Sequence, residues 1–227
     1  MQFILYYLHY VNNKENNMYA TDELIAGYQR FRKGYFQENK DRLSKLAEGQ
    51  APKIAIISCS DSRVDPTIIL DCEPGDLFVI RNVANLVPPC EDNDSYHGTS
   101  AALEYAVTAL KVESIIVLGH TQCGGIKYLM DSVGNKVDKS FISNWMMQLE
   151  NVRDEIATDK TIKDQEGRYS CCEKKAIQQS LDNLMTFPWL KERVEGNKLK
   201  IHGWRYDLYS SQLCALDEKS GKFVRIS

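Results

Sequence analysis

The chain has 227 residues, of which 43% are hydrophobic and 26% are charged, a balance that fits a soluble globular domain with a sizeable core. Its formal net charge is −3 and no run of lysine and arginine stands out, so the composition supports neither a nucleic-acid partner nor an anionic membrane. Seven cysteines are scattered without regular spacing, which argues against a disulfide framework and predicts a reducing, cytoplasmic compartment.

The first residues form an apolar stretch, "MQFILYYLHYV" (1–11), followed by a polar linker, "NNKENN" (12–17). The stretch is much shorter than the roughly 20 residues that span a bilayer, and it lacks the basic start and cleavage site of a secretory signal. We therefore predict an N-terminal extension over 1–17 and a single folded domain over 18–227. Whether the extension is dispensable or packs on a partner subunit stays open.

The rest of the chain alternates between helical and extended patterns. Apolar residues recur at helical spacing toward Gly49, which predicts a long N-terminal helix over 21–48 with Thr21 as its N-cap. Further helices are expected over 98–111, with Thr99 or Ser100 as cap, over 140–157, and over 171–195 with a break at Pro188. Strands are expected at 53–59, 76–82 and 114–120, and more exposed strands at 198–208 and 222–226.

Continuous β-branched runs separated by helices are typical of a parallel sheet that is covered on both faces. The pattern therefore predicts one α/β domain with a central, mostly parallel β-sheet flanked by helices. No internal repeat and no low-complexity linker follows residue 18.

Two of the expected strands end in potential metal ligands, in "ISCSDSR" (57–63) and "VLGHTQCGG" (117–125). Ligands collect outside the carboxyl ends of parallel strands, so Cys59, His120 and Cys123 would meet if these strands are neighbours. Two thiolates and one imidazole form a known type of catalytic zinc site with one coordination position open. Gly124 and Gly125 would allow close backbone approach at the start of the next helix.

The alternative is that these residues are structural, because a single strand-end cysteine is usually a small buried hydrophobe. Their occurrence together at two strand ends favours a metal. A four-ligand structural zinc would need another cysteine or histidine, and Cys72 and Cys90 fall in an expected helix and a loop. Asp61 is the nearer fourth group, and Arg63 beside it could hold it as a carboxylate.

At these residues the chain resembles the β-class carbonic anhydrases, most closely their plant-like branch. The resemblance rests on "CSDSR" (59–63) and "GHTQCGG" (119–125) and extends roughly from residue 21 to 215. It is also carried by "PGDLFVIRNVANLVPP" (74–89), "GTSAALEYAV" (98–107) and "HGWRYDLYS" (202–210). It implies one Zn²⁺ per chain on Cys59, His120 and Cys123, a homodimer or higher homo-oligomer, and reversible hydration of carbon dioxide to bicarbonate and a proton.

The resemblance also implies roles for residues around the metal. Asp61 and Arg63 match the family's catalytic dyad, which orients zinc-bound hydroxide for attack on carbon dioxide. Five residues match substrate-binding positions, namely Gln50 as a hydrogen-bonding group, Phe78, Val83 and Tyr105 as an apolar pocket, and Gly124 through its backbone N–H. Without the resemblance, Phe78 and Val83 would be interpreted as core residues.

Two other functions remain open from the sequence. One is hydrolysis of a related heterocumulene such as carbon disulfide, and the other is a zinc-binding protein whose metal site is closed. In some members of the family the matching aspartate closes the site at low pH, helped by bicarbonate beside a tryptophan and an arginine. Here Ile56 replaces the tryptophan although Arg81 keeps the arginine, so we expect an open-form enzyme without cooperative bicarbonate inhibition.

Overall fold

The computed structural model describes residues 20–91, 93, 95–134 and 139–226, so the predicted extension over 1–17 lies outside the described residues. The chain divides into two compact units, Met1–Gly49 and Gln50–Ser227, and each is described here by itself. The predicted domain boundary at residue 18 stays a prediction. Among the described residues, none of the helices combines the length and apolar character that a membrane crossing requires.

The described part of the first unit, residues 20–49, contains three consecutive helices, α2 (Ala20–Lys33), α3 (Tyr35–Glu38) and α4 (Lys40–Glu48). The expected helix over 21–48 is therefore present but broken twice. Gly34 and Asn39 adopt non-helical dihedral angles at the two breaks, and the Asn39 side chain donates a hydrogen bond to the Tyr35 carbonyl at 2.9 Å. The Thr21 cap is wrong, because α2 begins at Ala20 and places Thr21 inside its first turn.

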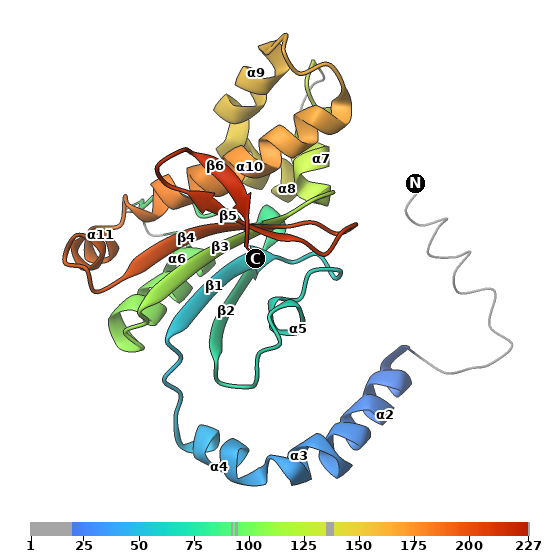
Figure 1. Cartoon of the computed structure of the whole chain (residues 1–227), viewed down its shortest axis with the longest axis vertical. Helices are drawn as coiled ribbons and strands as arrows, with labels where there is room; N and C mark the ends of the chain where they lie inside the picture. The colour runs from blue at the N-terminus through green and yellow to red at the C-terminus, as the bar shows by residue number, and fades with distance from the viewer. Residues whose placement is uncertain (1–19, 92, 94, 135–138, 227) are drawn as a thin grey trace, which may run out of the picture. The chain divides into compact units, whose positions relative to one another are not determined.

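The second unit is built on one six-stranded sheet in the order β2-β1-β3-β4-β5-β6 (Figure 1). The strands are β1 (Ile54–Cys59), β2 (Leu77–Asn82), β3 (Ser114–His120), β4 (Lys200–Tyr206), β5 (Leu213–Asp217) and β6 (Lys222–Arg225). Strands β1 to β4 pair in parallel, whereas β5 and β6 are antiparallel. The central, mostly parallel sheet is confirmed. The sequence missed only β5, a five-residue strand that is half-buried throughout.

The helices of this unit connect the strands and follow them. They are α5 (Pro66–Ile69), α6 (Gly98–Glu104), α7 (Gly124–Asp131), α8 (Phe141–Met146), α9 (Glu150–Thr158), α10 (Gln165–Leu184) and α11 (Pro188–Glu195). Pro188 starts α11, as the expected break requires. The Thr99 or Ser100 cap is wrong, because α6 begins directly after His97, and this helix continues as a π-helical turn over Tyr105–Ala109.

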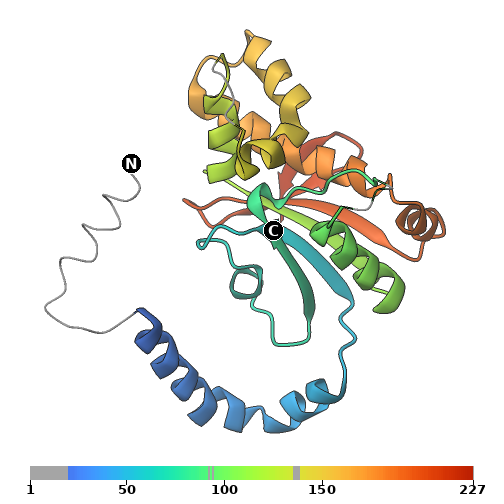
Figure 2. The same cartoon turned by 180° about the vertical axis from the view of Figure 1, so that it is seen from behind.

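The two central strands are buried on both faces. On one face Ala55, Ile57, Ile115 and Val117 pack in a cluster with residues of α6, α10 and α11, and Figure 2 shows α6 over the strands from this side. On the other face Ile56, Ile116 and Leu118 pack with partly buried residues such as Leu70 and Trp204. Each fully buried side chain of this size contributes about 1.5–3 kcal/mol, so the ends of β1 and β3 are firmly held.

Candidate metal centre

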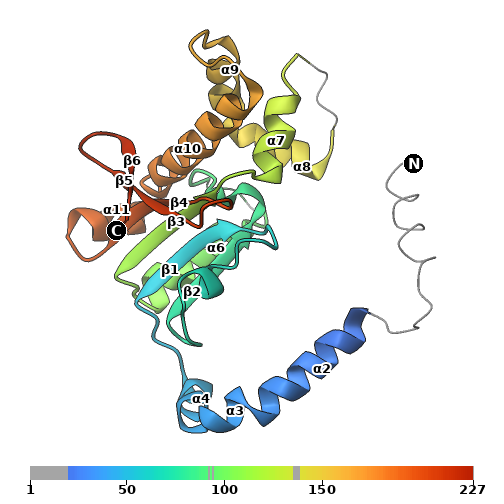
Figure 3. The same cartoon turned by 45° about the vertical axis from the view of Figure 1, so that its right-hand side comes forward.

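The carboxyl ends of β1 and β3 lie side by side, because these strands are direct parallel neighbours with Ser58 opposite Leu118. Cys59 is the last residue of β1 and His120 the last residue of β3. Cys123 follows after a short loop and immediately precedes α7 (Figure 3). The three candidate ligands were expected to meet if the two strands are neighbours, and β1 and β3 are neighbours.

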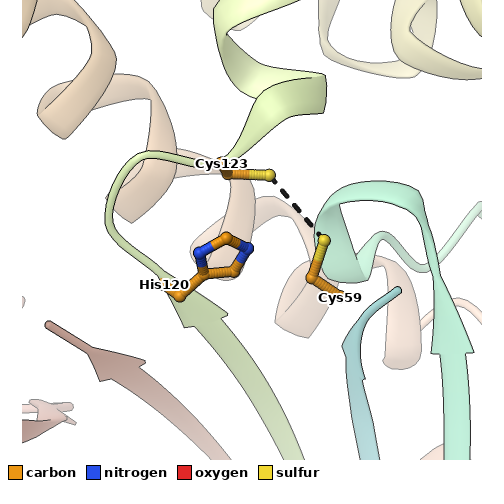
Figure 4. A group of neighbouring side chains, drawn as sticks. All are labelled: Cys59, His120 and Cys123. Atoms are coloured by element: carbon orange, nitrogen blue, oxygen red, sulfur yellow. Dashed lines mark hydrogen bonds between the residues drawn. The ribbon is translucent and has the colours of Figure 1, made fainter. Parts of the chain in front are cut away.

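The three side chains point toward one another (Figure 4). Their ligand atoms all lie within 4.8 Å of one another, and the two sulfurs are 3.9 Å apart. A separation near this value is expected for two sulfurs that each lie about 2.3 Å from one tetrahedral zinc ion. Cys59, His120 and Cys123 are only 4%, 1% and 2% exposed, so the group is shielded from solvent.

The imidazole of His120 provides the clearest test of whether a metal fits. Its Nδ1 lies 2.8 Å from the carbonyl oxygen of Thr121, which makes Nδ1 the donor and leaves the lone pair on Nε2. Nε2 is buried and has no hydrogen-bond partner among the described residues. A buried acceptor without a partner costs free energy, and a metal ion would remove this cost. The residues present therefore fit a zinc ion.

The two cysteines are electrostatically unequal. The hydrogen bond with Cys123 lowers the pKa of the Cys59 thiol far below its ordinary value, and the same contact together with burial raises the pKa of Cys123. The backbone N–H of Ala84 adds a donor to the Cys59 sulfur at 3.4 Å. The pair thus holds one negative charge readily, which is the charge state from which a cation is attracted.

Asp61 and Arg63 form a paired group beside the metal ligands. The Asp61 carboxylate accepts hydrogen bonds from the Arg63 backbone N–H at 3.0 Å, from Nε at 2.9 Å and from Nη2 at 2.7 Å. These bonds lower the pKa of Asp61 to about 2. Its Oδ2 lies 4.0 Å from His120 Nε2, so the fixed carboxylate stands next to the place a metal would occupy.

Comparison with known proteins places this site in a family. The family model described as carbonic anhydrase matches residues 54–213, which include all three candidate ligands and the dyad. Two relatives from Arabidopsis thaliana that are named beta carbonic anhydrases are 37% and 39% identical to it over 86% and 85% of its length. The chain belongs to the β-class carbonic anhydrases. The predicted family is thereby confirmed.

One relative of this β-class carbonic anhydrase is "Beta carbonic anhydrase 5, chloroplastic" of Arabidopsis thaliana, which is 37% identical over 86% of this chain and spans a longer sequence, since the match covers 64% of it. The solved β-carbonic anhydrase CcaA is 36% identical, with a TM-score of 0.85 over 91% of this chain and 92% of that chain. A tetrameric β-carbonic anhydrase of Sordaria macrospora is 30% identical, with a TM-score of 0.74 over 90% of this chain and 95% of that one.

Arg81 of this β-class carbonic anhydrase fixes the turn that carries Cys59 and Asp61. Its guanidinium donates to the carbonyl of Cys59 at 3.0 Å, to the carbonyl of Asp61 at 2.8 Å and to the carboxylate of Asp65 at 3.2 Å. Its donors are thus directed at the turn itself. Ile56, at the position where the resemblance led us to look for a tryptophan, is fully buried in the sheet.

Val83 is the predicted substrate residue that lies against the start of α7, directly after the candidate ligand Cys123. A Cβ atom on Gly125 would come within 2.8 Å of the Val83 side chain, so the close approach requires glycine there. No such approach exists at Gly124, which is exposed at the start of α7.

The remaining predicted substrate residues lie in three places. Phe78 in β2 packs against Tyr105 with ring centroids 5.9 Å apart, whereas Gln50 is exposed in the loop before β1. The substrate-binding roles of all five residues stay predictions.

Two contacts at the site were not anticipated from the sequence. The backbone of Ala84 has a positive φ of 63° and donates its N–H to the Cys59 sulfur, yet alanine gives no signal of such a conformation. The second is Gln122, between His120 and Cys123, which also has a positive φ of 60°. Only the three-residue spacing of the ligands hints at a tight turn there.

Proposed function

We propose that this protein catalyses the reversible hydration of carbon dioxide to bicarbonate and a proton, with one zinc ion held by Cys59, His120 and Cys123. The observation that carries the proposal is the buried Nε2 of His120, which faces two thiols and has no hydrogen-bond partner among the described residues. Membership of the carbonic anhydrase family supports the choice of reaction.

When bound, zinc would lower the pKa of a coordinated water and so supply a nucleophile near neutral pH. Asp61 would accept a hydrogen bond from that nucleophile and orient it toward carbon dioxide. Arg63 would keep the carboxylate ionised and turned away from the metal, which is supported by the three hydrogen bonds within the pair. The fourth coordination position would therefore stay open, as in an open-form enzyme.

The substrate would bind beside the metal ligands, in an apolar pocket formed by Val83, Phe78 and Tyr105. Val83 is the best supported member of this pocket, because it packs against Gly125 in the first turn of α7, the helix that follows Cys123. We propose that Phe78 and Tyr105 extend the apolar wall, while Gln50 and the backbone N–H of Gly124 hydrogen-bond carbon dioxide or bicarbonate. An apolar wall with few polar groups suits a small linear substrate without charge.

We also propose that the protein is a homodimer or a higher homo-oligomer. The first unit supports this, because Leu24, Ile25, Tyr28 and Phe31 are all more than 40% exposed on it. The tetrameric relative from Sordaria macrospora is consistent with such an assembly.

A cytoplasmic location is proposed from the cysteines. All seven are free thiols in the structure, including the exposed Cys90, which suits a reducing compartment. Imaging of the full chain as a fluorescent fusion in its own cells should show a cytoplasmic signal, and a signal confined to an organelle would contradict this.

The direct test is a stopped-flow assay of carbon dioxide hydration by the zinc-loaded protein, with Cys123→Ser as the inactive reference. We expect turnover that is lost in the variant. Carbon disulfide, offered as a second substrate, distinguishes a carbonic anhydrase from a heterocumulene hydrolase. The hydrolase would turn over carbon disulfide in preference to carbon dioxide. A zinc-loaded protein without turnover of either substrate would indicate a closed site and contradict the proposal.

A further inference from the structure

We propose that Glu173, together with Arg205, is a positioning residue that holds the loop between His120 and Cys123 in its metal-binding shape. Glu173 is located in α10, far along the chain from the loop, and its side chain is almost completely buried. The inference rests on the zinc site of the proposed function. It goes beyond that function by naming the group that fixes the backbone between two of the ligands.

The contact that carries the inference is made to the backbone of the loop. One carboxylate oxygen of Glu173 accepts the backbone N–H of Gln122 at 2.8 Å, and the other pairs with Arg205 Nη2 at 2.7 Å. Arg205 lies in β4 directly opposite Gly119, the residue before the ligand His120. The pair therefore connects α10 and β4 to the residue that separates two zinc ligands.

Gln122 needs such support because its backbone is in the left-handed region with a φ of 60°. This conformation is unfavourable for a residue with a side chain and persists only where the surroundings enforce it. Turning the Gln122 peptide back would move Cys123 relative to His120, so the left-handed turn is part of the ligand geometry.

The other polar groups of Gln122 are engaged as well. Its carbonyl accepts a hydrogen bond from Arg63 Nη2 at 3.1 Å. Its side-chain amide donates to Glu166 at 2.8 Å and accepts from Lys127. Gln122 is thus held by Glu173 at its N–H and by Arg63 at its carbonyl. Because Arg63 also pairs with Asp61, the contacts that hold the loop and the contacts that hold Asp61 share one residue.

The pairing also explains how a buried carboxylate can contact the loop between two of the candidate ligands. Arg205 neutralises Glu173, so the loop gains a strong hydrogen-bond acceptor without adding net negative charge behind the metal site. A solitary buried carboxylate would be unfavourable there, and its removal would in turn leave the guanidinium of Arg205 without its ion partner.

The test measures zinc affinity rather than activity. The full chain is stripped of metal, and the zinc dissociation constant is obtained by competition with a chromophoric chelator. Loss of a group that orients metal ligands typically weakens affinity by about 10–100-fold. We expect Glu173→Ala to lie near the upper end of this range and Glu173→Gln, which keeps an oxygen acceptor, near the lower end, with altered visible absorption of the cobalt-substituted protein.

Two control variants separate positioning from general stability. Leu190→Ala opens a cavity in α11 within the helix-covered core and should lower the melting temperature without changing zinc affinity. Ser170→Ala removes the other side chain that Arg205 contacts, at 3.2 Å, and should leave zinc affinity unchanged.

The proposal is overturned if folded Glu173→Ala or Glu173→Gln binds zinc as tightly as the wild type, or if Leu190→Ala weakens zinc binding to the same extent. Should Glu173→Ala fail to fold, Glu173→Gln decides alone, because it preserves size and one acceptor. Wild-type protein that binds no zinc would instead contradict the proposed function itself.

Discussion

Two regions of the molecule differ in how completely the chain itself buries and hydrogen-bonds their side chains. One is formed by the ends of β1 and β3, and the other is the helical segment over residues 20–48. At the strand ends, Cys59, His120 and Cys123 are buried, and the loop between the two later ligands is hydrogen-bonded on every side. In the helical segment, residues 21–48 include no buried side chain, and Tyr28 and Phe31 remain exposed.

This difference indicates where the protein needs something outside its own chain. Among the described residues, the strand ends leave two buried polar atoms without a hydrogen-bond partner, Ser58 Oγ and His120 Nε2. Of these, His120 Nε2 lies beside the two thiols, where a metal ion would give it a partner. The helical segment leaves apolar surface exposed, which the proposed self-association would cover. The four predictions below alter one region or the other, in order of decreasing expected effect.

Replacing a thiol ligand should have the largest effect. Cys59→Ser and Cys123→Ser should each lose most of the zinc, because a structural or catalytic zinc site with thiolates binds with about 10–16 kcal/mol and depends on each ligand. Zinc per chain after dialysis, measured by elemental analysis, checks this. Cys72→Ser is the matched control and should keep its zinc; full retention in the ligand variants would refute the assignment.

Asp61→Asn should nearly abolish turnover while the zinc stays bound. The amide keeps the shape of the side chain but loses the charge that pairs with Arg63, and the barrier should rise by about 2–4 kcal/mol, as for other oriented polar groups in active sites. Stopped-flow rates and zinc content measured on the same sample check this. Exposed Ser62→Ala serves as control; wild-type rates in Asp61→Asn would reduce the dyad to a structural role.

Gly125→Ala should destabilise the fold by about 1–3 kcal/mol through overpacking, because the added methyl group would meet Val83, Met146 and Ala84. The neighbouring Gly124→Ala has open space and should change stability by less than about 1 kcal/mol. Denaturant unfolding of both variants measures the difference. Equal stability of the two would show that the packing against Val83 is not as tight as the structure has it.

Truncating the exposed aromatics of the helical segment should weaken self-association and leave the second unit folded. Tyr28→Ser and Phe31→Ser should each cost about 1 kcal/mol or more of association free energy if they lie at the centre of an interface. Sedimentation velocity at micromolar concentration checks this, with exposed Tyr209→Ser of the second unit as control. An unchanged sedimentation coefficient in both variants would show that Tyr28 and Phe31 do not form the interface.

The sequence predicted the parts of the fold that depend on local pattern and burial. Continuous apolar runs located β1 and β3 because both faces of these strands are buried, and their terminal polar residues located the metal ligands. Caps were less predictable, since Thr21 and Thr99 lie just inside their helices and a shift of one residue changes the role.

Other features could not be predicted because they arise only from tertiary contact. The positive φ of Gln122 and its bond to Glu173 join residues from separate elements, and nothing in "CCEKK" (171–175) marks Glu173 as special. The substrate roles of Phe78 and Val83 came from the family resemblance, because a phenylalanine within a strand or a valine just after one cannot be told from an ordinary core residue by pattern alone.

The central claim is that Cys59, His120 and Cys123 bind one zinc ion and leave its remaining position to a small oxygen ligand. X-ray absorption at the zinc edge tests this most directly on the purified, zinc-loaded protein. The account predicts two sulfur neighbours at about 2.3 Å and two nitrogen or oxygen neighbours at about 2.0–2.1 Å. A shell without sulfur, or with three or more sulfurs, would contradict it.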